Sequence, residues 1–462
     1  MHPSPEHQPG HQTGHRADRP AGHPAGHPDR HGTFARRSAL RGAAVAAAAL
    51  ALPGAVSPAS AAGTGATSRD QPSGAGQLVL VGGGLSDDNA TVWGDIVRRA
   101  GGAGARIGVV TAASAPESQD PDAGTPDASN SVANGAFYVG LLRSYGARAE
   151  YVPVDLDHVG AADDPDLAVR VSRLDGFFFG GGDQYRLVQV LQRGPEQRDS
   201  AVLAAIRAAM ARGAVVAGTS AGAQIQAGPC MVTGGESWEG LRDGSAPGYF
   251  DDATVLGYLP RGGFGFFRSG LLDTHFTAYG REGRAVRLAA DTGRRRVFGL
   301  DPDTALVVER AGTTHERLSV LGRHGVSVLD LGAAHVATGA GGRWGIDGVR
   351  WTWLTSGDTY VPEADAVVPA RDTSPLRGVD RPVAVTTTDV FSSLQGSSPG
   401  YELVGLARDL VGTNRPSASG TTLEDDPRFV VTLRQDARTS ARTRDGATTT
   451  AFTRLALSVH AR

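Results

Sequence analysis

The sequence contains no lysine, so all 45 of its basic residues are arginine. This absence excludes a Ser–Lys dyad, a lysine Schiff base and the lysine of a phosphate-binding P-loop. Cysteine is almost as scarce, because Cys230 is the single one in the chain. One cysteine excludes an intrachain disulfide framework and a cysteine-rich metal site. We expect neither a bound metal ion nor a cofactor.

A strong net charge and a long apolar run are also lacking. Residues 1–61 hold six Arg and three acidic residues, and the remainder has 39 basic and 45 acidic residues, a net charge of −6. Because nucleic-acid binding requires a basic face, this balance gives no electrostatic case for a nucleic-acid partner. After residue 61 no stretch approaches the roughly 20 apolar residues that a membrane-spanning helix needs. We expect no membrane span in the mature chain.

What is present begins with an export signal. Residues 1–32 are rich in His, Pro and Gly, and we interpret them as a disordered leader rather than a metal site. The dipeptide Arg36–Arg37 matches a twin-arginine signal, Ala43–Leu52 is an apolar h-region, and Ala59–Ala61 supplies the small residues of a cleavage site. We predict that residues 1–61 are removed on export, leaving a protein that is extracellular or in the cell envelope.

Apolar runs alternate with helical patterns between residues 77 and 310. Strands that alternate with helices predict an α/β fold with a mostly parallel sheet and helices on both faces. The expected elements, in chain order, are strand Gln77–Val81, helix Thr91–Ala100, strand Arg106–Thr111, helix Asn134–Tyr145, strand Ala149–Val154, strand Gly176–Phe179, helix Ser200–Arg212 and strand Ala214–Ala217.

Three of these strands end in glycine-rich turns, at Gly82–Gly84, Gly180–Gly182 and Gly218–Gly222. Ligands of such sheets bind at the carboxyl ends of the strands, so we expect the three turns to converge on one site. The third turn reads strand, Gly-x-Ser-x-Gly, helix, which is the pattern of a nucleophile elbow. The glycines of an elbow allow a turn tight enough to expose the serine hydroxyl. Ser220 is therefore the candidate nucleophile.

Six histidines remain after residue 61, and one of them has surroundings suited to a catalytic base. A serine hydroxyl is a poor nucleophile at neutral pH and needs an adjacent base to accept its proton. His275 lies 55 residues after Ser220, in the apolar-flanked segment Leu271–Phe276. Buried histidines that hydrogen-bond to the backbone occur in similar segments, so catalysis and core packing both remain open at this point.

Four motifs then occur in a fixed order. They are FFFGGGDQYRL (Phe177–Leu187), GTSAGA (Gly218–Ala223), DTHF (Asp273–Phe276) and FGLDPDTALVV (Phe298–Val308). Their order and spacing resemble the cyanophycinase and aspartyl-dipeptidase family of serine peptidases, over roughly residues 77–310. The resemblance implies a fold similar to that of class I glutamine amidotransferases, with Ser in the place of Cys.

The resemblance also implies a catalytic triad. It makes His275 the base and draws a carboxylate from the loop between nucleophile and histidine to hold the imidazole in position. Glu236, which follows a Gly-Gly turn, is the first choice for this carboxylate. Glu239 and Asp243 are the alternatives.

The substrate-binding groups follow from the same motifs. Backbone N–H groups of Ala221 and of the Gly182–Asp183 turn are expected to form the oxyanion hole. Gln184 matches a glutamine that contacts substrate near the scissile bond in relatives, and Asp273–Thr274 lies where relatives shape the substrate pocket. Asp183 also suits the N-cap of the following helix.

Two departures from the family pattern concern the substrate. Cyanophycin-degrading members read D-Q-H-F with an Arg three residues beyond the Phe, whereas this chain has Thr274 and Tyr279. That Gln and Arg recognise the β-linked Asp–Arg unit, so their loss counts against cyanophycin itself. Arg281 and Arg284 remain nearby, either to bind a carboxylate bidentately or to form surface ion pairs.

Residues 311–462 carry no motif and are predicted to be a mostly β extension. Trp351 and Trp353 share one face of a predicted strand, where two core aromatics are favoured over a ligand-facing pair. The predicted organisation is a leader (1–61), a linker (62–76), a catalytic domain (77–310) and this extension (311–462).

The favoured function is an exported serine exopeptidase that hydrolyses a peptide or a β-linked aspartyl peptide. One alternative is an amidase or amidotransferase-like hydrolase on the same fold. Another is a secreted binding protein that keeps the elbow without the chemistry. The sequence leaves a homodimer open.

Overall fold

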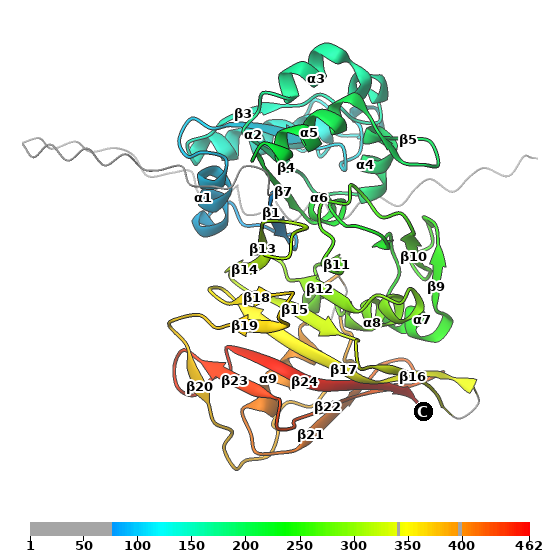
Figure 1. The fold of residues 1–462 in the computed structure, drawn as a ribbon. Helices are drawn as coiled ribbons and strands as arrows, with labels where there is room; N and C mark the ends of the chain where they lie inside the picture. The colour runs from blue at the N-terminus through cyan, green and yellow to red at the C-terminus, as the bar shows by residue number, and fades with distance from the viewer. Residues whose placement is uncertain (1–75, 340–341, 396–399) are drawn as a thin grey trace, which may run out of the picture.

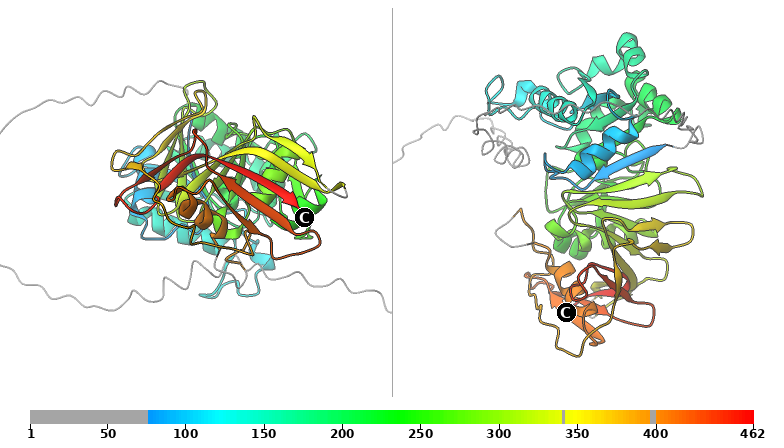
Figure 2. Two further views of the ribbon diagram at one scale, coloured as in Figure 1. Left: turned by 90° about the horizontal axis from the view of Figure 1, so that it is seen from below. Right: turned by 90° about the vertical axis from the view of Figure 1, so that its left-hand side faces the viewer.

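The computed structural model describes residues 76–339, 342–395 and 400–462. The predicted leader and the predicted linker up to residue 75 lie outside these ranges. Two large sheets, one of nine strands and one of ten, organise the described residues. They follow one another along the long axis of the molecule, with the amino-terminal half at one end and the carboxyl-terminal strands at the other (Figures 1 and 2).

The nine-stranded sheet has a parallel part and an antiparallel part. The parallel part, in spatial order, is β1 (Gln77–Val81), β7 (Val215–Thr219), β4 (Gly176–Phe179), β2 (Arg106–Val110) and β3 (Arg148–Tyr151). The antiparallel part continues outward from β1 through β13 (Thr304–Glu309), β14 (Arg317–Gly322), β18 (Thr359–Val361) and β19 (Ala366–Val368). The central strands are continuously apolar because both faces of the sheet are covered.

Helices cover both faces of this sheet. Helices α1 (Ala90–Arg99) and α2 (Ser131–Ser144) pack in one core with Val79 and Val81, whereas Leu78 and Leu80 belong to the core on the other face. That second core includes α3 (Pro165–Val171), α4 (Gln184–Leu191), α5 (Ala201–Ala211) and α6 (Ala221–Gln224). The alternation follows from the two-residue period of a strand. The predicted α/β fold is confirmed.

Side-chain caps fix where the first five helices begin. Each follows an Asn, Asp or Ser whose side chain accepts a hydrogen bond from a backbone N–H of the first turn. These caps are Asn89, Asn130, Asp164, Asp183 and Ser200.

The ten-stranded sheet begins with strands of the predicted catalytic domain and ends with the last strands of the chain. Its main order is β11 (Leu271–Thr274), β12 (Arg296–Leu300), β15 (Gly325–Asp330), β17 (Trp344–Thr355), β24 (Ala451–Ala461), β22 (Phe429–Arg434) and β21 (Ser417–Thr421). The strands β16 (His335–Thr338), β20 (Ser374–Leu376) and β23 (Ser440–Thr443) pair at its sides.

Three helices share the apolar core of this second sheet: α7 (Ser237–Asp243), α8 (Glu282–Asp291) and α9 (Glu402–Val411). The strand-rich character of the carboxyl-terminal region matches its prediction, whereas α9 was not predicted. Trp351 and Trp353 are both buried, as core aromatics.

Strands on the two sides of residue 310 are hydrogen-bonded neighbours in both sheets. In the first sheet β13 pairs with β14, with Val308 opposite Leu318. In the second sheet β12 pairs with β15, with Phe298 opposite Val328. The residues after 310 therefore complete the two sheets on which the site described below is built.

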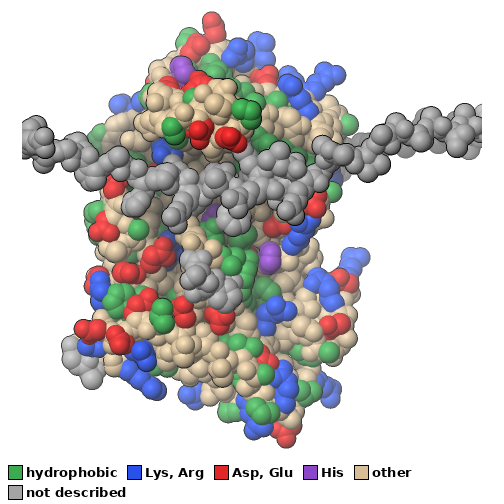
Figure 3. Space-filling view, turned by 180° about the vertical axis from the view of Figure 1, so that it is seen from behind, with side chains coloured by type: hydrophobic (Ala, Val, Ile, Leu, Met, Phe, Trp, Pro, Cys, Tyr) green, Lys and Arg blue, Asp and Glu red, His purple; other side chains and the backbone are tan. Residues whose placement is uncertain are grey.

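The remaining elements are short and lie in the connections. Three are 3₁₀ helices: η2 (Glu117–Gln119), η3 (Val159–Asp163) and η4 (Thr277–Tyr279). The others are the strands β5 (Gln192–Arg193), β6 (Arg198–Asp199), β8 (Met231–Val232), β9 (Ser245–Pro247) and β10 (Leu256–Leu259). Within the described ranges, no helix has the length and apolar character needed to cross a bilayer. Acidic and basic side chains are interspersed over the face that Figure 3 displays.

Candidate active site

Ser220 lies in a tight turn between β7 and α6. Its backbone is strained, with φ 53° and ψ −118°, and its N–H donates to the carbonyl of Val81 at 3.0 Å. A Cβ added at Gly218 would lie 2.2 Å from the carbonyl oxygen of Gly222, and one at Gly222 would lie 2.1 Å from that of Phe179. Both positions of the Gly-x-Ser-x-Gly pattern therefore require glycine on steric grounds.

The three glycine-rich turns meet around this serine. They follow β1, β7 and β4, which are adjacent parallel strands in register, so their carboxyl ends lie together. A Cβ added at Gly181 would lie 3.5 Å from the Cβ of Ser220. One added at Gly83 would lie 2.1 Å from Cε1 of His275. The turns thus line one site, which contains both Ser220 and His275.

His275 reaches the serine from the other sheet. It follows β11, and its backbone N–H donates to the carbonyl of Gly82 at 2.7 Å. Its Nε2 lies 2.8 Å from the Oγ of Ser220, which is hydrogen-bonding distance. The ring of Tyr279 stacks on the imidazole, with centroids 4.6 Å apart and planes 7° apart. This arrangement suits transfer of a proton from the serine hydroxyl to the imidazole.

The turn after His275, η4, is held by residues that are distant in sequence. Oδ1 of Asp301 accepts hydrogen bonds from the N–H and the hydroxyl of Thr277, at 2.8 and 2.7 Å. The N–H of Tyr401 donates to the carbonyl of Thr277 at 3.0 Å, and that of Leu394 donates to Ala278 at 2.9 Å. Residues of the predicted extension therefore fix the segment that carries Tyr279.

A buried ion pair lies beside the histidine. Arg284 binds Asp273 through two hydrogen bonds of 2.8 and 2.7 Å, and the two side chains are 5% and 1% exposed. A third donor of Arg284 binds the carbonyl of Gly235 at 2.6 Å. This guanidinium is committed to groups of the chain itself. The predicted surface ion pair is wrong for Arg284, because the pair is in the interior.

Arg281 is also in the interior. It donates to the carbonyl of Thr274 at 2.9 Å and lies over the ring of Tyr279, 5.1 Å from its centroid. Burial, and next the neighbouring charge of Arg284, lower the pKa of Arg281 to about 10. Thr274 is buried, and its N–H donates to Asp273 at 2.9 Å. These contacts pack Arg281 and Tyr279 against the histidine strand.

The three predicted triad carboxylates differ in their surroundings. The charge of Glu236 interacts with both Arg281 and Arg284. Asp243 is exposed, and its ion pair with Arg242 at 2.6 Å lowers the pKa of its carboxyl. Glu239 lies in the first turn of α7 and interacts with Arg242. Only Glu236 of the three interacts with the arginines beside His275.

The predicted oxyanion and substrate groups lie at the start of two helices. Ala221 is the first residue of α6, where helical geometry leaves N–H groups without intrahelical acceptors. The N–H of Asp183 donates to Ala113 at 2.8 Å, so it is already used, and Gly182 remains the second candidate donor. Nε2 of Gln184 donates to the carbonyls of Val232 and Thr233, at 3.1 and 3.3 Å.

The carboxylate of Asp183 accepts two hydrogen bonds from within the chain. One oxygen accepts from the N–H of Tyr185 at 2.8 Å, as the N-cap of α4. The other accepts from the hydroxyl of Tyr249 at 2.7 Å. Asp183 therefore fixes the start of α4 and ties it to Tyr249.

Two buried carboxyl groups near the site were not anticipated. Glu282 is 2% exposed, and its Oε2 has no hydrogen-bond partner among the described residues. Burial, with a contribution from Asp301, raises the pKa of Glu282 to about 8. Asp301 is fully buried, and burial raises the pKa of its carboxyl too. A glutamate that starts a helix usually faces solvent, so no signal in the sequence marked Glu282.

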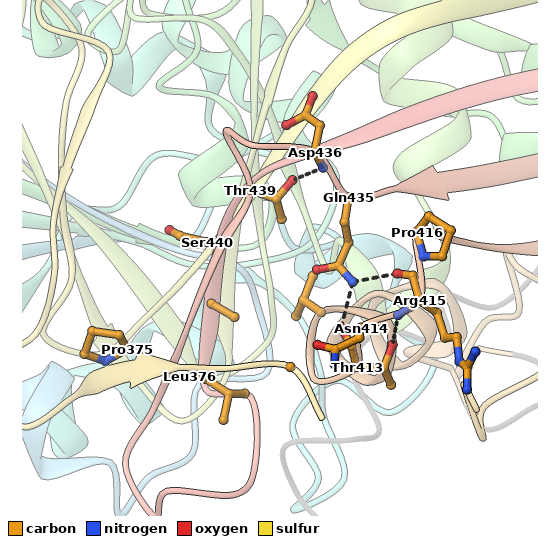
Figure 4. Close-up of a pocket in the computed structure, with 13 residues that line it drawn as sticks. Pro375, Leu376, Thr413, Asn414, Arg415, Pro416, Gln435, Asp436, Thr439 and Ser440 are labelled. Atoms are coloured by element: carbon orange, nitrogen blue, oxygen red, sulfur yellow. Dashed lines mark hydrogen bonds between the residues drawn. The ribbon is translucent and has the colours of Figure 1, made fainter. Parts of the chain in front are cut away.

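Two cavities lie apart from Ser220 and His275. One, of 500 Å³, lies among the end of α9, β20 and β23 (Figure 4). The amide of Gln435 at its wall donates to the carbonyls of Thr413 and Arg415, at 3.0 and 2.8 Å. The other cavity, of 170 Å³, lies beside the start of β11. Neither cavity is lined by Ser220 or His275.

Comparison with known proteins identifies a peptidase family that matches the part of the chain containing this site. Peptidase family S51 matches residues 125–314, a range that contains both Ser220 and His275. The cyanophycinases of Synechococcus elongatus and Thermosynechococcus vestitus are each 32% identical over 266 residues, covering 56% of this chain and 70% of the relative. The cyanophycinase of a Nostoc species is 31% identical over 199 residues, 42% of this chain and 58% of the relative.

One solved structure is a crystal structure of a peptidase from an acI-B1 Actinobacterium. It is 20% identical and superposes with a TM-score of 0.42, over 63% of this chain and 98% of that protein.

Proposed function

Because this chain belongs to peptidase family S51 and is a serine-type peptidase, we propose that it is an exported exopeptidase with a Ser220–His275–Glu236 triad. Its substrates are peptides, including those with β-linked aspartyl residues. The observation that carries this proposal is the 2.8 Å separation of Ser220 Oγ and His275 Nε2 at the carboxyl ends of parallel strands.

The proposed mechanism proceeds through an acyl-enzyme. Ser220 Oγ attacks the scissile carbonyl while His275 accepts the hydroxyl proton. The N–H groups of Ala221 and Gly182 stabilise the negative charge that forms on the carbonyl oxygen. His275 then protonates the leaving amine, the C–N bond breaks, and the acyl group remains on Ser220. Water, deprotonated by His275, attacks this ester. The ester C–O bond then breaks, His275 gives its proton to Ser220 Oγ, and the acid product leaves.

Glu236 is proposed to orient the imidazole and to stabilise its protonated form. The support is that Arg284 binds both Asp273, two residues before His275, and the carbonyl of Gly235, one residue before Glu236. The loop of Glu236 is thereby tied to the histidine strand. Asp243 and Glu239 instead interact with Arg242 on α7.

The substrate class rests on the relatives and on two substituted positions. The similarity to cyanophycinases and the motif resemblance together support the β-linked aspartyl class. Tyr279 stacks on His275 at the position where cyanophycin-degrading relatives carry an arginine. A flat aromatic ring lacks the forked N–H donors that a guanidinium presents to a ligand. We infer that the leaving residue differs from the Asp–Arg unit of cyanophycin.

A substitution of the nucleophile tests the enzyme. Purified Ser220→Ala is expected to lose hydrolysis of β-aspartyl dipeptides by about 10³-fold or more in kcat. The matched control is Ser440→Ala, which removes an exposed hydroxyl on β23. Full activity in Ser220→Ala would exclude the proposal. Cleavage of simple amides, with no turnover of any peptide, would favour the amidase alternative that Thr274 and Tyr279 motivate.

A set of three variants tests which carboxylate completes the triad. Glu236→Gln, Glu239→Gln and Asp243→Asn each replace one candidate by its isosteric amide. We expect a fall of about 10³-fold in kcat for Glu236→Gln and a change below about threefold for the other two. The largest fall in either of the other variants would reassign the triad.

Export is proposed from the twin-arginine pattern at Arg36–Arg37 and the h-region at Ala43–Leu52. The test is the amino terminus of the secreted protein, which mass spectrometry should place at about residue 62. Replacing both arginines by lysine should retain the chain inside the cell.

A further inference from the structure

The 170 Å³ cavity lies at the amino ends of β11 and β12, and arginine dominates its wall. Four of the nine residues that line it are Arg268, Arg294, Arg295 and Arg296. The others are three glycines, a proline and Ser269, so no acidic side chain lines it. Positive charge gathered at so small a volume favours negative charge beside it, less at Arg268 and Arg295, which are exposed to solvent, than at Arg294 and Arg296, which are partly buried.

The chain supplies only part of that negative charge. Arg295 and Arg296 share one carboxylate, Asp330, at 3.2 and 3.5 Å. Asp365 is 3.9 Å from Arg296, but it also binds Arg454 at 3.1 Å and so brings no net charge to the cavity. These two arginines are therefore balanced by about one carboxylate.

The other two arginines have no acidic partner in the part of the chain that the structure describes. Nε of Arg268 donates to the carbonyl of Gly265 at 2.8 Å, and this is a neutral group. Arg294 is partly buried, and its Nε has no hydrogen-bond partner among the described residues. A buried guanidinium N–H without an acceptor costs free energy, which a bound acceptor would recover.

One more carboxylate touches the wall of the cavity without pairing an arginine. Glu316 accepts a hydrogen bond from the hydroxyl of Ser269, and its other oxygen accepts from the N–H of Gly312 at 3.1 Å. Even when Glu316 and Asp330 are both counted, four positive charges face two negative ones.

The carboxyl end of α8 accounts for the position of Arg294 but not for the presence of four arginines at one cavity. Arg294 lies three residues beyond Asp291, the last residue of α8, where carbonyl dipoles attract cations. Arg268 enters from a different segment, the loop between β10 and β11. The helix end therefore does not account for Arg268 at the same cavity.

We propose that this cavity binds a small oxyanion with two or more negative charges. Arginine presents forked N–H donors that match phosphate, sulfate and carboxylate oxygens. Inorganic phosphate or sulfate and a dicarboxylate such as aspartate share this chemistry. The site is distinct from the catalytic pair, because β11 separates Gly270 at the cavity from His275 by about 16 Å. A bound anion would tie the loop before β11 to the loop before β12.

Thermal unfolding of the mature chain tests this proposal. Inorganic phosphate, sulfate and aspartate are each titrated at constant ionic strength, with sodium chloride as the reference. We expect at least one dianion to raise Tm by about 2 °C or more above chloride. Phosphate and sulfate acting without aspartate would identify an inorganic anion, and aspartate acting alone would identify a dicarboxylate.

Variants locate the binding. Arg268→Gln and Arg294→Gln should each weaken the anion affinity about tenfold, as measured by isothermal titration calorimetry. Arg434→Gln, which removes the same charge from an exposed position on β22, should bind as the wild type does. Aspartate bound at the catalytic site would be unaffected by these changes, so loss of binding in them is specific to the cavity.

Two results would overturn the proposal. One is the absence of any dianion effect beyond that of chloride on the wild type, which does not depend on how the variants fold. The other is wild-type affinity in both Arg268→Gln and Arg294→Gln. Neither result bears on catalysis by Ser220.

Discussion

The two members of the proposed catalytic pair, Ser220 and His275, stand on different sheets and are held in different ways. Ser220 follows β7 of the nine-stranded sheet, and its turn is fixed by neighbours at the ends of β1 and β4. His275 follows β11 of the ten-stranded sheet, and its turn is fixed by Asp301, Leu394 and Tyr401. We call these the nucleophile half and the histidine half of the site.

The difference lies in the range of the interactions. In the nucleophile half, strain and close backbone packing act between the ends of adjacent parallel strands of one sheet and need only glycine and small side chains. In the histidine half, an interior ion pair, a buried carboxyl group and contacts from beyond residue 310 act together. A substitution far from the reaction therefore reaches the histidine more readily than the serine.

The largest effect is expected where the histidine half depends on a buried charge. Arg284→Met leaves Asp273, which is 1% exposed, without its partner, and should reduce the free energy of unfolding by about 3–5 kcal/mol. Arg287→Met on the same helix removes an arginine from a more exposed pair with Asp291 and should cost about 1 kcal/mol or less. Urea denaturation measures both, and equal losses would contradict the asymmetry.

Gly222→Ala tests the nucleophile half. The new Cβ would lie 2.1 Å from the carbonyl oxygen of Phe179, so the elbow must shift. We expect a loss of about 1–3 kcal/mol of stability and a fall of about 100-fold in kcat. The control is Gly405→Ala in α9, where no atom lies within 4 Å of the added Cβ. That change should be neutral or stabilising, and unaltered kcat in Gly222→Ala would count against a sterically fixed elbow.

Thr277→Val tests how the histidine turn depends on distant groups. It removes one of the two hydrogen bonds that Oδ1 of Asp301 accepts, at 2.7 Å. Because Asp301 is fully buried, we expect a loss of about 1–2 kcal/mol and a fall of about tenfold in kcat with little change in KM. Thr338→Val, at an exposed position on β16, should change neither quantity. A stability loss without any change in kcat would separate the turn from catalysis.

Glu282→Gln tests how the stability of the histidine half depends on pH. The folded pKa of Glu282 is raised to about 8 from 4.5, so the folded state binds a proton that the unfolded state has released over this range. Its contribution to stability is complete below about pH 4.5 and is lost as pH rises toward 8, by about 1 kcal/mol per pH unit. Denaturation at pH 5, 6 and 7 should show a steeper decline for wild type than for Glu282→Gln, and parallel curves would contradict this.

Part of the site follows from short stretches of sequence. The apolar strands before Gly82, Gly180 and Gly218, the Gly-x-Ser-x-Gly turn and the DTHF segment each carry a local pattern. Those patterns indicate Ser220 and His275 independently of the tertiary structure. The interior positions of Arg281, Arg284 and Glu282 had no such signal, because a charged residue in a helix is normally on the surface.

By itself the sequence determined the alternating α/β order, the residues that line the glycine turns and the serine and histidine that meet there. These features depend on periodicity and on steric limits within a few residues, which a sequence states directly. Only the tertiary structure decided that the histidine stands on a second sheet, that strands beyond residue 310 complete both sheets, and that four arginines surround one cavity. Those outcomes depend on which distant segments pack together, and a local pattern does not encode burial or partners across the chain.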